Sequence, residues 1–346
     1  MGYKAFDLHC DSVDSLIEGK DLRQAVPGVH VDLPRLRKGN VGLQVFAAYV
    51  PPGTDTDKAF AYAKERLDAI ETFAKSDESL TLVETAGDLR ASMALGRTGV
   101  MKAVENALAI ENSLEKLEKL RREKVRIMTL VHSQHMSWVA SCTGTAGFDG
   151  PGKSISGTGD GRGGGLGSFG EQVVDAMNDL GIIPDVSHSS ESAFWDIIGR
   201  SKKPVIASHS CAWNFCAAAR NLKDDQLKAL GDTGGVVGVN FYSAFLSEAF
   251  RLSLEKDRGT TAPENPSVKV PSSIIADHIE YMVKMAGEDS VALGSDFDGI
   301  EATPEGVSGC DYFPVLEKEL TARGFSDKRI EKIFNLNFLR VLEQWE

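Results

Sequence analysis

The sequence predicts an α/β protein in which residues 1–346 form one domain, a closed (β/α)8 barrel. Short apolar runs rich in valine and isoleucine alternate with amphipathic stretches, which is the pattern of βαβ units and a parallel sheet. The number of these runs fits a barrel of this length. Several runs also end in histidine, aspartate or glutamate. A doubly wound open sheet is the main alternative, because it contains the same units.

The candidate strands are bounded by glycine, proline or polar residues. They cover residues 5–9, 41–50, 80–85, 100–106, 125–132, 182–188, 204–209, 235–242 and 291–299. Apolar residues recur at helical spacing between them, in residues 57–76, 113–124, 168–181, 190–201, 224–234 and 272–287. No change of composition marks a second domain and no internal repeat is visible, so we expect the elements to share one core.

Composition narrows the choice of partners and compartment. The net charge of −12 argues against a nucleic-acid partner and against an anionic membrane surface. No apolar run has membrane-spanning length, and the first residues, MGYKAFDLHCDS, lack the apolar core of a signal peptide. The five cysteines are scattered without a Cys-x-x-Cys pair, so we expect neither a disulfide framework nor a thiolate zinc site. These features predict a cytoplasmic protein with no membrane contact.

A glycine-rich segment, residues 142–166, interrupts the regular alternation. Within it, GFDGPGKS (147–154) fits the phosphate-loop pattern G-x-x-x-x-G-K-[ST]. A phosphate loop joins a buried strand to a helix, whereas small polar residues precede this stretch and closely spaced glycines, which disfavour helix, follow it. We therefore expect a loop that lies over the active site instead of a nucleotide site.

The first candidate strand ends in His9 and Asp11, whose side chains share a face because the strand period is two. His188 and His209 end two later runs. In a parallel barrel all these ends lie on one rim, where imidazole and carboxylate groups suit zinc or a similar ion. For each residue alone the alternative is an ordinary hydrogen-bonded side chain. Taken together, the four residues favour metal ligation.

Glu105 ends another apolar run, where a buried carboxylate is costly unless cations pair with it. One carboxylate can bridge two ions, and two ions can share a water whose pKa falls toward neutrality, which makes it a nucleophile for hydrolysis. A salt bridge at the barrel rim is the alternative. Glu111, a few residues further on, competes with Glu105 for the bridging role.

Two further residues have plausible roles in such a reaction. Asp296, in GSDFDG, is placed to take a proton from a metal-bound water and pass it to a leaving amine. The same stretch lacks the further acidic positions of a calcium loop. Arg220 precedes a candidate helix and is either a surface residue or a fork for a substrate carboxylate. The residues alone leave that choice open.

Long segments of the chain resemble the membrane (renal) dipeptidase family of zinc peptidases, within the metal-dependent amidohydrolase barrels. They occur in the family's order and cover nearly the whole chain. The matching segments are DLHCDS (7–12), VEN (104–106), LVHSQHMSW (130–138), GLGSFGEQVVDAMNDLGIIPDVSHSS (165–190), PVIASHSCAWNFCAAARNLKDD (204–225), VVGVNFYSAFL (236–246), GSDFDG (294–299) and NFLRVLE (337–343).

The resemblance implies a TIM-like barrel with two zinc ions per chain at the strand ends. It implies that His9 and Asp11 hold one ion, that His188 and His209 hold the other, and that Glu105 bridges both. Iron, manganese or cobalt could fill the same ligands.

The resemblance also implies roles around the substrate. His132 would bind the substrate carbonyl, Arg220 the terminal carboxylate, and Asp296 would handle the proton. Tyr242, in segment 236–246, is expected to contact the substrate. His135 stands where relatives often have asparagine, which bears on substrate contacts.

The expected function is hydrolysis of short dipeptides, including those with a C-terminal D-residue, by a hydroxide held between two zinc ions. The resemblance also implies a homodimer. An alternative is another dizinc hydrolase acting on N-acyl amino acids, lactones or β-lactams. A further alternative is a barrel that has lost catalysis and serves as a binding protein, although an intact ligand set argues against it.

Overall fold

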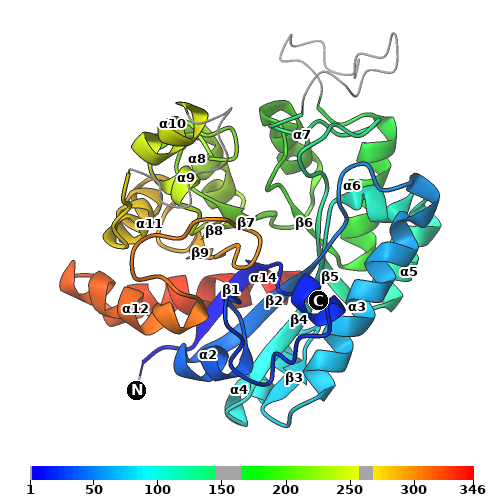
Figure 1. Cartoon of the computed structure of the whole chain (residues 1–346). Coiled ribbons are helices and arrows are strands. Elements are labelled where there is room, and N and C mark those ends of the chain that lie inside the picture. Colours follow the sequence, from blue (N-terminus) through cyan, green and yellow to red (C-terminus); the bar gives the residue numbers. More distant parts are fainter. Residues whose placement is uncertain (1, 145–164, 257–267) are drawn as a thin grey trace.

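The computed structural model describes residues 2–144, 165–256 and 268–346. Eight parallel strands form a closed barrel with helices around it (Figure 1), which confirms the predicted fold. Each strand pairs with the next, and the ring closes because β2 pairs with β4 as well as with β1. In ring order the strands are β1 (Ala5–Cys10), β9 (Val291–Leu293), β8 (Val236–Val239), β7 (Ile206–Ser210), β6 (Ile183–Asp185), β5 (Val125–Thr129), β4 (Thr98–Glu105) and β2 (Val41–Tyr49).

One candidate strand does not belong to the ring. The run 80–85 forms β3 (Leu80–Leu82), which pairs only with the first residues of β4. The later residues of β4 pair along the same edge with β5. The short strand β3 therefore extends the sheet outside the barrel, where its residues have no place in the ring of strand ends.

The predicted helical stretches all form helices, and further helices lie in segments where the sequence pattern was weaker. The predicted ones are α3 (Ala59–Lys75), α5 (Leu114–Arg122), α6 (Ser168–Leu180), α7 (Glu191–Arg200), α8 (Asp224–Asp232) and α11 (Ser273–Ala286). The others are α1 (Val13–Ile17), α2 (Leu33–Lys38), α4 (Ala86–Ala94), α9 (Ser243–Leu246), α10 (Glu248–Lys256), α12 (Phe313–Ala322), α13 (Asp327–Glu331) and α14 (Asn337–Gln344), with the short turns η1 (Thr56–Lys58), η2 (Ala107–Ile110), η3 (Cys310–Tyr312) and η4 (Lys332–Leu336).

Local sequence explains where several helices begin. Before α7, the Ser190 side chain accepts a hydrogen bond from the Ala193 backbone N–H. Before α4, Thr85 and Asp88 form a reciprocal capping box. Each cap satisfies backbone donors that the first helical turn leaves without partners. The α7 cap matters for function, because it fixes the chain directly after His188.

A buried cluster fills the barrel with apolar residues from every ring strand. Helix α14 contributes Phe338 and Leu342 to this cluster, and Trp345 follows directly. Helix α14 contacts the ring at the beginning of a strand. Asn337 Nδ2 donates a hydrogen bond to the carbonyl of Val291, the first residue of β9 (2.8 Å). Helix α14 therefore closes the end of the barrel opposite the strand C-termini, and the second main cluster packs the outer helices on the strands.

Among the described residues, no helix combines the length and apolar character needed to cross a bilayer.

Candidate metal centre and active site

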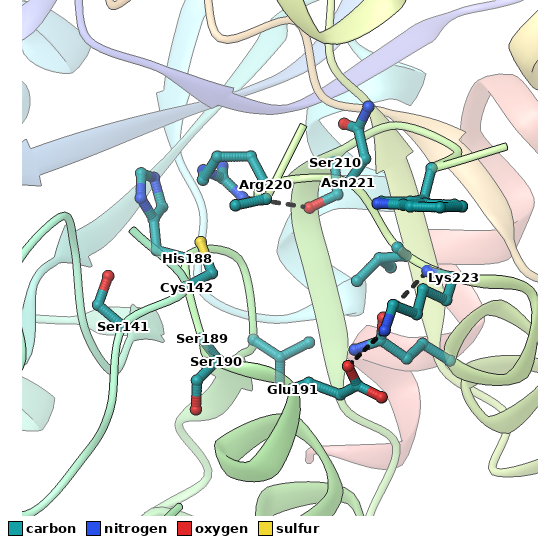
Figure 2. A pocket seen from close by; sticks show the side chains of 15 residues that line it. Ser141, Cys142, His188, Ser189, Ser190, Glu191, Ser210, Arg220, Asn221 and Lys223 are labelled. Carbon is teal, nitrogen blue, oxygen red and sulfur yellow. Dashed lines mark hydrogen bonds and ion pairs between the residues drawn. The ribbon is translucent and has the colours of Figure 1, made fainter. Parts of the chain in front are cut away.

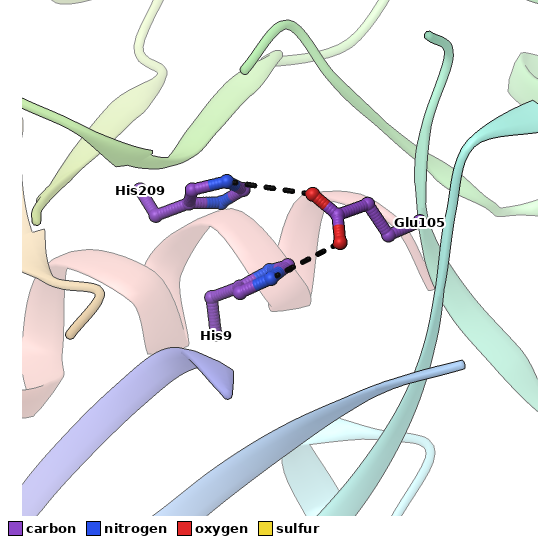
Figure 3. Close-up of side chains that lie close together, drawn as sticks. All are labelled: His9, Glu105 and His209. Carbon is purple, nitrogen blue, oxygen red and sulfur yellow. Dashed lines mark ion pairs between the residues drawn. The ribbon is translucent and has the colours of Figure 1, made fainter. Parts of the chain in front are cut away.

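At the carboxyl ends of the barrel strands, each oxygen of the Glu105 carboxylate faces a different histidine (Figure 3). Its Oε2 atom is 3.6 Å from Nε2 of His9, and its Oε1 atom is 3.6 Å from Nε2 of His209. The three residues come from β4, β1 and β7, and all are buried. A carboxylate whose two oxygens face different candidate ligands can bridge two ions.

The other predicted ligands join the same cluster. Asp11 Oδ2 is 3.4 Å from Nε2 of His9, and His188 Nε2 is 3.0 Å from Glu105 Oε1. His132, three residues after β5, places its Nε2 3.9 Å from the same Glu105 oxygen. Asp296 Oδ1, three residues after β9, is 3.9 Å from His9 Nε2. The structure thus brings every predicted ligand and proton carrier together on one rim.

The donor set fits metal ions. Among the described residues, His9 Nε2 and Asp11 Oδ1 are buried without a hydrogen-bond partner. His188 Nε2 and His209 Nε2 face each other at 3.1 Å. Such buried groups need compensation, and imidazole nitrogens with carboxylate oxygens are ligands that zinc and related divalent ions accept. Three overlapping groups could each hold an ion: His9, Glu105 and His209; Glu105, His132 and His188; and His9, Asp11 and Asp296.

Hydrogen bonds orient His209 for ligation. Asp185, at the end of β6, accepts from Thr129 Oγ1 (2.5 Å) and from Ser208 Oγ (2.5 Å). Because the Ser208 hydroxyl proton goes to Asp185, its oxygen accepts from His209 Nδ1 (2.7 Å). His209 Nε2 is then left with a lone pair that points at the cluster, which is how outer residues orient a metal-binding histidine.

Burial and charge set the protonation of the cluster. Burial holds the pKa of His188 and of His209 well below the ordinary value, so both imidazoles are neutral. Burial also acts against protonation of His9, but the carboxylates of Glu105 and Asp11 raise its pKa well above the ordinary value. Burial raises the pKa of Asp296 to about 8. Metal binding would therefore release protons from His9 and Asp296.

The backbone carries strain at three positions in or beside the cluster. His188, Asp296 and Asn106, which follows Glu105, have φ angles of 68°, 64° and 78°. Non-glycine residues rarely adopt positive φ, and such strain concentrates at functional sites. The Asn106 side chain stabilises its own turn by donating to the Val50 carbonyl (2.9 Å) and accepting from the Leu108 N–H.

Position 299 requires glycine because the backbone there passes close to the cluster. A Cβ atom at this position would lie 2.1 Å from Asp11 Oδ2 and 2.8 Å from Asp296 Oδ1. Any side chain would therefore displace two carboxylates of the candidate site. The sequence contained the glycine in GSDFDG, but its proximity to Asp11 depends on how β1 and β9 pair.

A pocket of about 460 Å³ opens onto the cluster, and we call it the metal-facing pocket. Tyr242, Arg220 and His132 all line it, as predicted for substrate-binding residues. Tyr49, the last residue of β2, also lines it and was not predicted. The Tyr49 hydroxyl lies 3.4 Å from His132 Nδ1. Its position at a strand end is the sequence signal for this role, although tyrosine is not a typical metal ligand.

Arg220 is almost fully buried beside the cluster. Its Nη2 donates to the His209 carbonyl (2.9 Å), so the guanidinium is fixed to a strand that carries a ligand. The alternative of a surface arginine is therefore wrong. Tyr242 is connected to Asp296 through Asn240, which donates to Asp296 Oδ2 (2.8 Å) and accepts from the Tyr242 N–H (2.6 Å).

Some candidates lie elsewhere. Glu111 accepts from the Phe60 N–H (2.8 Å) and pairs with Lys116, so it does not compete with Glu105. His135 accepts from the Ser141 N–H (3.1 Å) and belongs to none of the candidate metal groups among the described residues.

The glycine-rich segment can be placed only in part. Its early residue Thr143 lines the metal-facing pocket. The stretch GFDGPGKS (147–154) lies outside the described residues.

The fold and the site together define a class of protein: a parallel (β/α)8 barrel hydrolase whose active site is built to hold metal ions at the strand ends. The sequence profile of one family, described as membrane dipeptidase (peptidase family M19), matches residues 2–346. The chain belongs to this family of metal-dependent dipeptidases, as the resemblance predicted.

Individual relatives agree with this membership. The chain is 31% identical to an uncharacterised dipeptidase of Schizosaccharomyces pombe, with 92% of this chain and 72% of the relative covered. It is 29% identical to Dipeptidase 3 of Mus musculus, with 95% of this chain covered but only 60% of the relative's length. A solved metallopeptidase of Rhodobacter sphaeroides, liganded with a phosphinate mimic of L-Ala-D-Ala, matches with a TM-score of 0.84, 25% identity and full coverage of both chains.

Proposed function

We propose that this chain hydrolyses dipeptides, including those with a C-terminal D-residue, with two zinc ions at the barrel rim. The observation that carries the proposal is the position of Glu105, whose two oxygens each face a different histidine. Family membership and the solved relative with an L-Ala-D-Ala mimic support the substrate class.

The positions of these residues suggest how the ligands would be divided between two ions. His9, with Asp11 beside it, lies near Oε2 of Glu105, whereas His188 and His209 lie near Oε1. These five residues would hold the ions, with Glu105 between them. Bound zinc would polarise the peptide carbonyl and lower the pKa of a water molecule.

The remaining residues act on the substrate. His132 is neutral because burial lowers its pKa, so a ring N–H can donate to the carbonyl oxygen as negative charge develops there. Asp296 accepts from Asn240 through Oδ2, so its Oδ1, which faces the cluster, can carry a proton between water and the leaving amine.

Arg220 explains a restriction to short substrates. A buried guanidinium that faces the metal-facing pocket can hold one carboxylate through two parallel hydrogen bonds. A dipeptide places its terminal carboxylate one residue from the scissile bond, whereas a longer peptide has no carboxylate at that distance. Tyr242 lines the same pocket and would contact the bound dipeptide.

The test is metal content of the purified protein together with hydrolysis of L-Ala-D-Ala and L-Ala-L-Ala before and after chelation. We expect close to two zinc ions per chain, loss of activity on chelation and recovery with zinc. Two bound metals with cleavage of N-acyl amino acids or lactones, but no dipeptide, would move the function to the alternative hydrolase class. No bound metal after zinc is offered would contradict the metal centre.

The family resemblance also supports a homodimer. Light scattering of the zinc-loaded protein would test it, and a mass of one chain would reject it.

A further inference from the structure

A second pocket adjoins the metal-facing pocket at Arg220 and His188, and we call it the rear pocket (Figure 2). It has a volume of about 240 Å³ and shares those two residues with the metal-facing pocket. Its further walls come from the chain around Ser189 and Glu191, before and at the start of α7, and from Trp213 and Lys223, before α8. The two pockets therefore meet at the residue proposed to hold the substrate carboxylate.

The rear pocket contains polar atoms that have no hydrogen-bond partner in the described part of the chain. Arg220 is only 6% exposed, yet among the described residues its Nε has no hydrogen-bond partner. The same holds for Ser189 Oγ and His188 Nδ1, both of which line this pocket. Buried polar atoms are normally paired, so a pocket where several remain unpaired is suited to a polar ligand.

The charge of the rear pocket favours an anion. Helices α7 and α8 both begin at its wall, and a helix N-terminus favours negative charge. Arg220 and Lys223 each bring a positive charge, whereas Glu191 brings the only carboxylate among its lining residues. Lys223 Nζ lies 2.6 Å from Glu191, at the outer part of the pocket. In the metal-facing pocket, by contrast, Arg220 is accompanied by several carboxylates.

We propose that the rear pocket receives the side chain of the substrate's C-terminal residue and selects a side-chain carboxylate, as in a C-terminal aspartate or glutamate. This inference rests on the proposed dipeptidase function. An α-carboxylate held by Arg220 places the adjoining Cα at the boundary between the pockets. The side chain on that Cα then extends toward Ser189 and Lys223, where donors are unpaired or able to exchange partners.

The experiment compares kcat/KM for L-Ala-D-Glu with that for L-Ala-D-Gln, which has the same shape without the charge. We expect the wild-type protein to favour the glutamate substrate by about tenfold, because hydrogen bonds to charged groups contribute more than neutral ones. Lys223→Gln should reduce this ratio and Glu191→Gln should increase it. Lys228→Gln is the matched control, since Lys228 lies on α8 and pairs with Asp232 away from the pocket.

A second readout does not depend on turnover. All five cysteines are within the described residues, and Cys142, which lines the rear pocket, is the only one that is not buried. A phosphinate mimic of L-Ala-D-Glu should slow modification of Cys142 by methyl methanethiosulfonate more than the matching D-Gln mimic does.

The outcomes distinguish failure of the subsite assignment from failure of the proposed dipeptidase function. If L-Ala-D-Ala is cleaved but the glutamate-to-glutamine ratio is near one, or does not move in either variant, the subsite assignment is overturned and the dipeptidase stands. Equal protection of Cys142 by the two mimics would also overturn the assignment. If no dipeptide is cleaved by the zinc-loaded protein, the proposed function fails and this inference fails with it.

Discussion

The metal-facing pocket and the rear pocket share Arg220 and His188 but are built in different ways. The metal-facing side is formed by strand ends, with its histidines and carboxylates fixed by buried hydrogen bonds and by residues with positive φ. The rear side is formed by loops and helix starts, and its charged pair is about half exposed. The comparison shows that the sheet holds the reacting groups, whereas the connections are available to set substrate preference.

The largest expected effect concerns the residue on which the metal-facing side depends. Glu105→Gln removes the carboxylate charge that faces His9 and His209, so both proposed ions should be lost. We expect kcat/KM for L-Ala-D-Ala to fall by about a thousandfold or more. Metal analysis and steady-state kinetics measure this. Glu111→Gln is the matched control and should keep its metal, because Glu111 contacts Phe60 and Lys116 instead of the cluster. Equal metal content in the two variants would contradict the bridging role.

The next effect concerns the boundary between the pockets. Arg220→Lys keeps the positive charge but loses the planar fork that fits a carboxylate. We expect kcat/KM to fall by about a hundredfold, mainly through KM, while metal content stays at the wild-type value. Kinetics with L-Ala-D-Ala and metal analysis check this. Arg200→Lys, which alters an ion pair with Asp175 on the surface, is the control. An unchanged KM in Arg220→Lys would remove the carboxylate-binding role.

A smaller effect should follow from filling the space beside Asp11. Gly299→Ala puts a Cβ within 2.1 Å of Asp11 Oδ2, so the carboxylate must move. We expect zinc affinity to fall by about tenfold, because displacing a metal ligand should cost about as much as removing a group that orients one. Zinc titration with a competing chelator measures it. Gly199→Ala in α7 is the control, because a Cβ there meets nothing within 4 Å. If both variants bind zinc as the wild type does, Asp11 tolerates displacement.

The smallest expected effect on activity at neutral pH comes from His278, whose hydrogen bonds hold the chain beside the wall of the rear pocket. His278 accepts from the Ala212 N–H (3.2 Å), next to Trp213 in the rear wall, and its Nε2–H donates to the Leu246 carbonyl (3.0 Å). Burial lowers its pKa to about 4. The unfolded chain therefore binds more protons than the folded one between pH 4 and 6.5, so stability rises with pH across that window.

As pH falls from 6.5 to 4, His278 should cost the folded state on the order of 3 kcal/mol. Denaturant unfolding of the metal-free protein at several pH values would show this loss. His278→Asn should flatten that part of the pH profile, whatever its effect on absolute stability. Identical slopes in both proteins would show that His278 is not the group responsible.

The sequence was most informative where a chemical residue type coincided with a strand end. His9, Glu105 and His209 could be assigned because parallel strands all bring their carboxyl ends to one rim. The period of the apolar runs also placed the main helices. It could not show that residues 80–82 lie outside the ring, because a strand paired on one edge has the same local pattern as one paired on two.

Other features needed the assembled structure. Gly299 and Asp11 are far apart in the chain, and their contact depends on the pairing of neighbouring strands. The rear pocket depends on how the loop that carries Arg220 packs against the start of α7. The resemblance to a family, in turn, supplied roles for Arg220 and Tyr242 that neither spacing nor periodicity could distinguish from surface positions.

The closure of the barrel by α14 has a consequence for synthesis of the chain. Residues of α14 and Trp345 complete the cluster that contains one or more apolar residues from every ring strand. During translation all eight strands leave the ribosome before this helix does. Until then the end of the barrel opposite the strand C-termini exposes apolar surface, which favours aggregation in large domains during folding. The nascent chain therefore depends on α14, which is made after all eight strands, to bury the interior, and chaperones that bind apolar surface have a defined target until that helix docks.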